Sequence, residues 1–203
     1  MTALHRSILC VAGVLLLDGL IAGAPAFAHT GSGMGGGFLS GVRHPLAGID
    51  HLLAMVAVGL WGAYLGRPLI IALPVIFPAF MVVGGLLGIA GVPVPPVEVA
   101  IALSLVLLGS AIATAFRAPV WLACLLVGVF GLFHGYAHGQ ELPAASDPTA
   151  YGLGFVLATG GLHMAGITIG LLNSRPGGQV ATRTLGFGIA IAGGYFLYKA
   201  AVR

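Results

Sequence analysis

One uninterrupted apolar segment decides the fold class: residues 69–91 read LIIALPVIFPAFMVVGGLLGIAG. The segment holds no charged residue, and it is as long as the roughly 20-residue helix that crosses a lipid bilayer. Five further apolar stretches accompany it in the chain, and breaks rich in proline, glycine or arginine separate them. We therefore predict an all-α, polytopic membrane protein with six transmembrane helices, at about residues 45–66, 69–91, 97–116, 119–139, 150–172 and 184–202.

The composition of the whole chain agrees with a membrane protein. Of its 203 residues, 59% are hydrophobic and only 6% are Asp, Glu, Lys or Arg, whereas a soluble domain carries about a quarter charged residues. So few ionised side chains cannot cover the surface of a soluble enzyme. The 8 Lys and Arg residues are scattered singly, so the sequence offers no basic patch for a nucleic acid.

Residues 1–28 have the pattern of a cleavable secretory signal peptide. Arg6 supplies the basic start, an apolar stretch interrupted only by Asp18 follows, and Ala26-Phe27-Ala28 forms a small-x-small cleavage site. Cleavage leaves residues 29–203 as one six-helix domain whose N-terminal residue, His29, lies outside the cytoplasm. The free amine and the imidazole of His29 could then bind one metal ion together, or His29 is simply the residue after the cleavage site. An uncleaved anchor is the alternative, and it places His29 on the same side.

Two polar clusters stand at the ends of predicted spans. Residues 44–51 read HPLAGIDH and open the first span, and residues 133–141 read FHGYAHGQE and close the fourth. By parity both ends lie on the outer side of the membrane, so we expect the two clusters to meet at one depth. Ionisable groups inside a membrane are costly and usually functional. The pattern therefore favours metal or proton handling over simple hydrogen-bonded links between helices.

Helix geometry restricts which side chains can share an ion. His134 and His138 are four residues apart, lie on one helix face, and could chelate a single ion. Glu141 joins that stripe if the helix continues so far. His44 and His51 are seven residues apart, a rise of about 10.5 Å in a regular helix, and metal–nitrogen bonds are only about 2 Å long. Either His44 belongs to an outer relay site, or the chain before the first span folds back.

Two further polar residues, Asp50 and His163, lie within predicted spans. Asp50 points about 100° away from His51 on a helix, and a carboxylate there could accept the second ring N–H of a ligating imidazole. His163 lies in the middle of the fifth predicted span, deeper than the two clusters. It is either the next station on an inward path or the partner of Thr159 or Thr168 in an interhelical hydrogen bond.

At these residues the sequence resembles the HupE/UreJ family of nickel and cobalt permeases. The family's first motif is His, five residues, then Asp-His, which residues 44–51 match. The second motif is Phe-His-Gly-x-Ala/Val-His-Gly-x-Glu, and residues 133–141 match every fixed position. The resemblance covers essentially the whole mature chain. By motif match it implies that the residues needed for transport are His44, Asp50, His51, His134, His138 and Glu141.

The resemblance also implies what the protein does and where. It implies a multi-pass permease of the bacterial inner membrane, not an enzyme, with a periplasmic N-terminus. The cargo would be Ni²⁺, or Co²⁺ as a second candidate, and the protein would serve hydrogenase or urease maturation. No prosthetic group is predicted, because the metal is cargo. Imidazole and carboxylate ligands suit such borderline divalent ions.

Other features of transport stay open. The chain lacks a phosphate-binding loop, so downhill movement and proton coupling are the remaining energy sources. A homo-oligomer is compatible with the sequence. One alternative function is an intramembrane zinc hydrolase, in which three imidazoles hold zinc and Asp50 or Glu141 acts as the base. Another is a membrane cytochrome with bis-histidine haem. A stoichiometric bound zinc together with hydrolytic activity would identify the hydrolase. A visible absorption band of the purified protein would identify the cytochrome.

Overall fold

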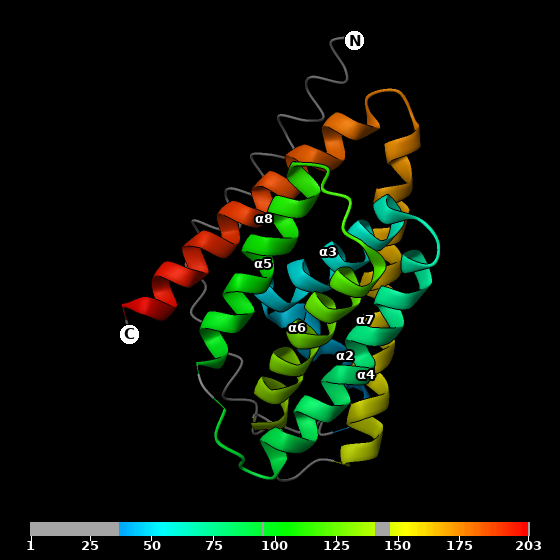
Figure 1. The fold of residues 1–203 in the computed structure, drawn as a ribbon. Coiled ribbons are helices and arrows are strands. Elements are labelled where there is room, and N and C mark those ends of the chain that lie inside the picture. Colours follow the sequence, from blue (N-terminus) through cyan, green and yellow to red (C-terminus); the bar gives the residue numbers. More distant parts are fainter. Residues whose placement is uncertain (1–36, 95, 141–146, 203) are drawn as a thin grey trace. The chain divides into compact units, whose positions relative to one another are not determined.

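The computed structural model describes residues 37–94, 96–140 and 147–202, and this part of the chain is helical and contains no strand (Figure 1). The all-α prediction is therefore confirmed for the described residues. The predicted signal peptide, His29 and Glu141 lie outside them. The helices are α2 (Phe38–Ala47), α3 (Ile49–Leu65), α4 (Leu69–Ile89), α5 (Val97–Ala113), α6 (Val120–Gln140), α7 (Pro148–Leu171), the 3-10 turn η1 (Leu172–Ser174) and α8 (Gly178–Ala201).

All six predicted apolar stretches contain helix, but the helices differ in length. Four in the described ranges are long and apolar enough to cross a membrane alone, namely α4, α6, α7 with its following turn, and α8. Helices α2 and α3 pass the same test only as a pair that is bent by 87°. Helix α5 is a shorter apolar helix of 17 residues. The structure therefore supports a multi-pass membrane protein, while the count of six spans stays a prediction.

The first predicted span is not the single regular helix that the sequence suggested. Gly48 has φ −91° and ψ 112°, an extended conformation, so α2 ends before it and α3 begins after it. Pro45, which was expected to start the span, lies inside α2. The carboxylate of Asp50 accepts the backbone N–H of His51 at 2.9 Å in the first turn of α3. Because a carboxylate there compensates the positive end of a helix dipole, it favours a new helix start at this point.

The last helix begins earlier than predicted. Helix α8 starts at Gly178 rather than at residue 184, directly after Gly177, which has a left-handed φ of 77°. Its first turns are polar, and the Nε–H of Arg183 donates to the carbonyl oxygen of Ala113 at the end of α5 at 2.8 Å. The apolar pattern alone misplaced this boundary because a helix can continue beyond the segment that is apolar enough for lipid.

Glycines bring the helices into close contact. A Cβ atom on Gly84 of α4 would collide with the carbonyl oxygen of Leu132 on α6, and one on Gly135 of α6 would collide with that of Met81 on α4. Helices α3 and α7 approach in the same way, since a Cβ on Gly59 would meet the His163 carbonyl. Close backbone approach of this kind drives helix association where lipid removes the hydrophobic effect.

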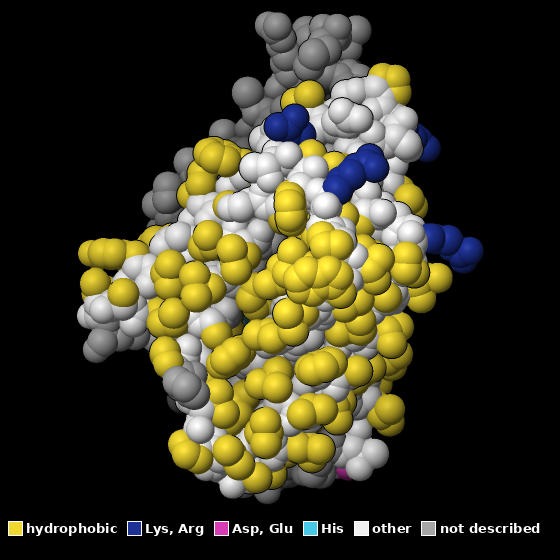
Figure 2. Space-filling view, viewed as in Figure 1, with side chains coloured by type: hydrophobic (Ala, Val, Ile, Leu, Met, Phe, Trp, Pro, Cys, Tyr) yellow, Lys and Arg dark blue, Asp and Glu magenta, His cyan; other side chains and the backbone are white. Residues whose placement is uncertain are grey.

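The outer faces of the helices are apolar. Figure 2 shows one face covered mainly by hydrophobic side chains, with Lys and Arg confined to the upper part of the view. Large apolar side chains are well exposed on several helices, for example Val75 on α4, Leu157 on α7 and Tyr198 on α8. Such a surface suits contact with lipid rather than water. Polar side chains that are buried instead therefore need a specific explanation.

We expect Gly84→Ala to destabilise the protein by about 1–3 kcal/mol, because its methyl group would force α4 away from α6. The matched control is Gly85→Ala, whose added methyl would meet only ordinary van der Waals contacts, the nearest atom being 3.5 Å away. Thermal unfolding of the purified variants in detergent measures the difference. Equal melting temperatures for the two variants would contradict the close packing of α4 on α6.

Candidate metal site

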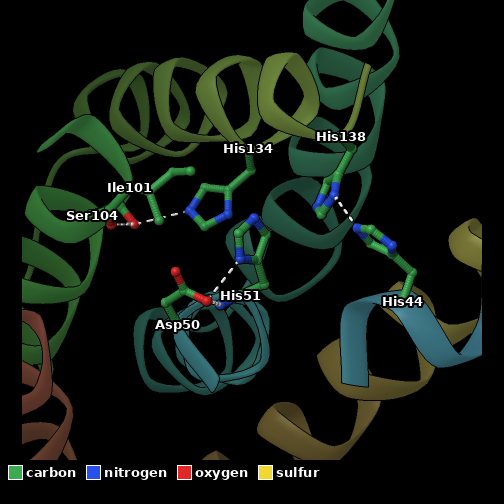
Figure 3. Close-up of polar contacts among 7 residues, drawn as sticks. All are labelled: His44, Asp50, His51, Ile101, Ser104, His134 and His138. Atoms are coloured by element: carbon green, nitrogen blue, oxygen red, sulfur yellow. Dashed lines mark hydrogen bonds and ion pairs between the residues drawn. The ribbon is translucent and has the colours of Figure 1, made fainter. Parts of the chain in front are cut away.

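The bend at Gly48 brings His44 and His51 onto one partner, the ring of His138 (Figure 3). The ring centroid of His138 lies 4.7 Å from that of His44 and 4.5 Å from that of His51. The limit of 10.5 Å therefore does not apply, because it assumed a regular helix and the helix is broken between the two residues. The chain does fold back, but it does so at Gly48 rather than before Pro45.

Helix α6 supplies two histidines that face the same cluster. His134 is completely buried and His138 is 7% exposed. The ring of His51 contacts both of them, with a centroid distance of 4.9 Å to His134. The prediction that the two sequence-distant polar segments meet is confirmed for these side chains. We call His44, His51, His134 and His138 the histidine cluster.

Asp50 holds the ring of His51. One carboxylate oxygen, Oδ1, lies 2.9 Å from the ring nitrogen Nδ1 and accepts the backbone N–H of the same residue. In a neutral imidazole one nitrogen carries the proton and the other carries a lone pair. Because Nδ1–H donates to Asp50, Nε2 of His51 carries the lone pair. This is the supporting role that the sequence suggested for the carboxylate.

Ser104 on α5 holds the ring of His134, and sequence reasoning missed it. The serine hydroxyl donates its only hydrogen to the carbonyl oxygen of Ile101 at 2.6 Å. Its oxygen, 3.1 Å from Nε2 of His134, can then only accept, so Nε2 carries the ring proton and Nδ1 carries the lone pair. A lone serine in an apolar segment commonly bonds its own helix backbone. Nothing in the sequence distinguishes Ser104 from that ordinary case.

The third pair joins His138 to His44, with 2.9 Å between Nδ1 of His138 and Nε2 of His44. When His138 is the donor, its other nitrogen, Nε2, carries the lone pair. Three ring nitrogens of the cluster are thus buried without a hydrogen-bond partner: His51 Nε2, His134 Nδ1 and His138 Nε2. Buried polar atoms are nearly always paired. These three therefore call for a partner that is not a protein side chain, such as a cation or water.

The cluster is not a finished ligand set. Within the described ranges, no three His, Cys, Asp or Glu side chains are arranged to hold one ion. The rings pack against one another edge to face, and His138 is bonded to His44. Ion binding would therefore require small ring rotations. Glu141 and His29 were also expected to contribute ligands, and both lie outside the described residues. Metal binding by all of these side chains stays a prediction.

His163 does not belong to the cluster. It lies on α7 and is buried, and the ring of Phe77 contacts it at 5.5 Å and contacts His134 at 5.4 Å. Of the interhelical hydrogen bonds that the sequence suggested for His163, those to Thr159 and Thr168 are absent, and the backbone of Pro74 on α4 lies near the ring instead. The hydroxyl of Thr168 donates to the carbonyl oxygen of Met164, and that of Thr159 has no hydrogen-bond partner.

Comparison with known proteins gives two matches. A family model described as HupE / UreJ protein matches residues 15–196, which include the whole histidine cluster. The chain is also similar to Protein HupE of Rhizobium leguminosarum bv. viciae. The two are 43% identical over 174 residues, which cover 85% of this chain and 91% of that protein. No solved structure matches the chain.

We expect Ser104→Ala to weaken Ni²⁺ binding by about 10–100-fold, the usual effect of losing a group that orients a ligating imidazole. Without the serine oxygen, Nε2 of His134 is no longer the favoured site of the ring proton. The matched control is Ser110→Ala, at an exposed position on the same helix. Isothermal titration calorimetry of the purified proteins in detergent measures the affinities. Identical affinities for the Ser104 variant and the wild type would remove Ser104 from the site.

Proposed function

The chain belongs to the HupE/UreJ family, and we propose that it transports Ni²⁺, with Co²⁺ as a second substrate, across the bacterial inner membrane. In this proposal the ion passes through the site formed by Asp50 and the histidine cluster, and the transported metal serves the maturation of nickel enzymes. The mature N-terminus, with His29, lies on the periplasmic side.

The three buried and unpaired imidazole nitrogens are the observation that supports this proposal. Imidazole nitrogen suits Ni²⁺ and Co²⁺, whereas thiolate and thioether ligands would select softer ions. The supporting groups of these rings, Asp50 and Ser104, leave one lone pair on each of two imidazoles for an ion. The carboxylate adds a negative charge beside a divalent cation, which reduces the cost of holding that charge away from water.

The exposure of the ligands supports a direction of movement. Asp50 and His51 are 22% and 15% exposed, while His134 and His138 are buried. An ion that arrives from the outside would meet the carboxylate and its imidazole first. It would then exchange water for the deeper nitrogens one at a time. Stepwise replacement of the hydration shell keeps each barrier small, which transport requires.

We expect His51→Ala and His138→Ala each to lower uptake of radioactive nickel by at least about tenfold in cells, because each removes a ligand. The control is Ser110→Ala, whose exposed side chain lies away from the cluster, and immunoblots of membranes verify equal amounts of all variants. Uptake at the wild-type rate by either histidine variant that is normally expressed would refute the site. Zinc bound by the purified wild type together with hydrolysis would favour the zinc hydrolase instead.

We also expect nickel uptake to fall as the external pH drops below about 6, since a protonated imidazole has no lone pair for a metal. Uptake falls rather than rises in acid because the neutral imidazole binds the ion, and acid protonates the imidazole. Initial uptake rates measured over a pH series in buffered proteoliposomes test this. Rates that stay flat or rise in acid would be inconsistent with ligation by neutral histidine.

A further inference from the structure

Helix α7 carries a buried polar stripe below the histidine cluster. Tyr151, Phe155, Thr159 and His163 follow one another at four-residue spacing, so they share one face of the helix. All four are buried, although α7 also exposes Leu157 at 63%. The ring of Phe155 lies against that of His138, with 4.5 Å between centroids. The stripe thus begins at the cluster and leads along α7 to His163.

The lower end of this stripe holds polar atoms without partners. Thr159 and His163 are each 1% exposed, and Thr159 Oγ1 and both ring nitrogens of His163 make no hydrogen bond. A threonine in a helix can satisfy its hydroxyl on its own backbone, as Thr168 does on Met164. Thr159 does not. Three unpaired polar atoms one helical turn apart point to a ligand, because buried polar groups are otherwise paired.

Helix α4 adds a backbone oxygen to the same place. Pro78 has no N–H, so the carbonyl of Pro74, four residues earlier, lacks its usual helical donor. That carbonyl oxygen lies near the ring of His163, without the geometry of a hydrogen bond. Carbonyl oxygens freed in this way inside a membrane are tolerated where they face protein or a water-filled cavity. Here the oxygen faces His163 of α7.

A cavity of about 230 Å³ lies beside this stripe of α7. It lies between α4, α6 and α7, and its lining includes His138 from the histidine cluster, Pro78 and Thr159. The direct line from His134 to His163 is closed by the ring of Phe77, which contacts both.

We propose that His163, Thr159 and the carbonyl oxygen of Pro74 form a second, inner binding station for the transported divalent cation, on the face of α7 that contacts the histidine cluster through Phe155. The proposal rests on the proposed transport function. The station offers an imidazole nitrogen with two neutral oxygens and no carboxylate. It would therefore bind the ion more weakly than the outer site beside Asp50, as an ion that must leave requires.

Two variants with a matched control test the station. Thr159→Val removes the hydroxyl and keeps the shape, and His163→Leu removes the imidazole. Thr168→Val is the control, because its hydroxyl is exposed and bonded to its own helix. Equilibrium dialysis of the purified full chain in detergent measures Ni²⁺ binding, and proteoliposomes that contain the same proteins measure uptake.

We expect the wild type and Thr168→Val to show a tighter and a weaker saturable phase of Ni²⁺ binding. Thr159→Val and His163→Leu should keep the tighter phase, lose the weaker one, and take up nickel at least about tenfold more slowly. If His163→Leu does not accumulate in membranes, the binding and uptake of Thr159→Val alone test the inner station. Wild-type binding and uptake in Thr159→Val would overturn the inner station. Absence of uptake by the wild type itself would instead reject the transport function.

Discussion

The bend at Gly48 is the constraint on which the whole site depends. A regular helix through this residue would separate His44 from His51 by about 10.5 Å along its axis. With the two helices at 87°, both imidazoles contact the ring of His138. A break exposes the backbone N–H groups of a new helix start, and such groups need partners. Asp50 satisfies one of them with the same oxygen that holds the ring of His51. One carboxylate therefore stabilises both the break and the orientation of the ligand.

Close helix packing is the second requirement, because an imidazole reaches only a few ångströms from its backbone. Gly84 and Gly135 let α6 approach α4, and Gly59 lets α7 approach α3. These approaches set the distances between rings that lie on different helices, and they leave Phe77 in contact with both His134 and His163. Lipid provides little hydrophobic drive for association, so the helices associate through the close packing that small residues allow. They determine how near the polar groups of neighbouring helices come.

The sequence predicted which histidines meet, but it did not predict how they meet. Motif spacing and the parity of the spans were sufficient to place His51 beside His134 and His138. The break at Gly48 was not predictable, because glycines are frequent throughout this chain and most of them lie inside helices. Ser104 was missed because a single serine in an apolar helix usually bonds its own backbone. Its second contact, to His134, becomes visible only once α5 and α6 are placed together.

The described residues of the histidine cluster do not form a complete ligand set, which fits the proposed transport better than a structural metal site. A structural metal site closes four preset ligands around its ion and stabilises the fold. Here the unpaired nitrogens are gathered, yet the described side chains are not arranged around one point, and His138 is bonded to His44. An ion that recruited both rings would have to break this hydrogen bond and turn the rings, which offsets part of its binding energy. When the ion leaves, the bond between His44 and His138 can form again. In the proposed transport, this hydrogen bond would compete with the ion for the ring of His44, while His138 keeps its unpaired Nε2, and the competition would favour release.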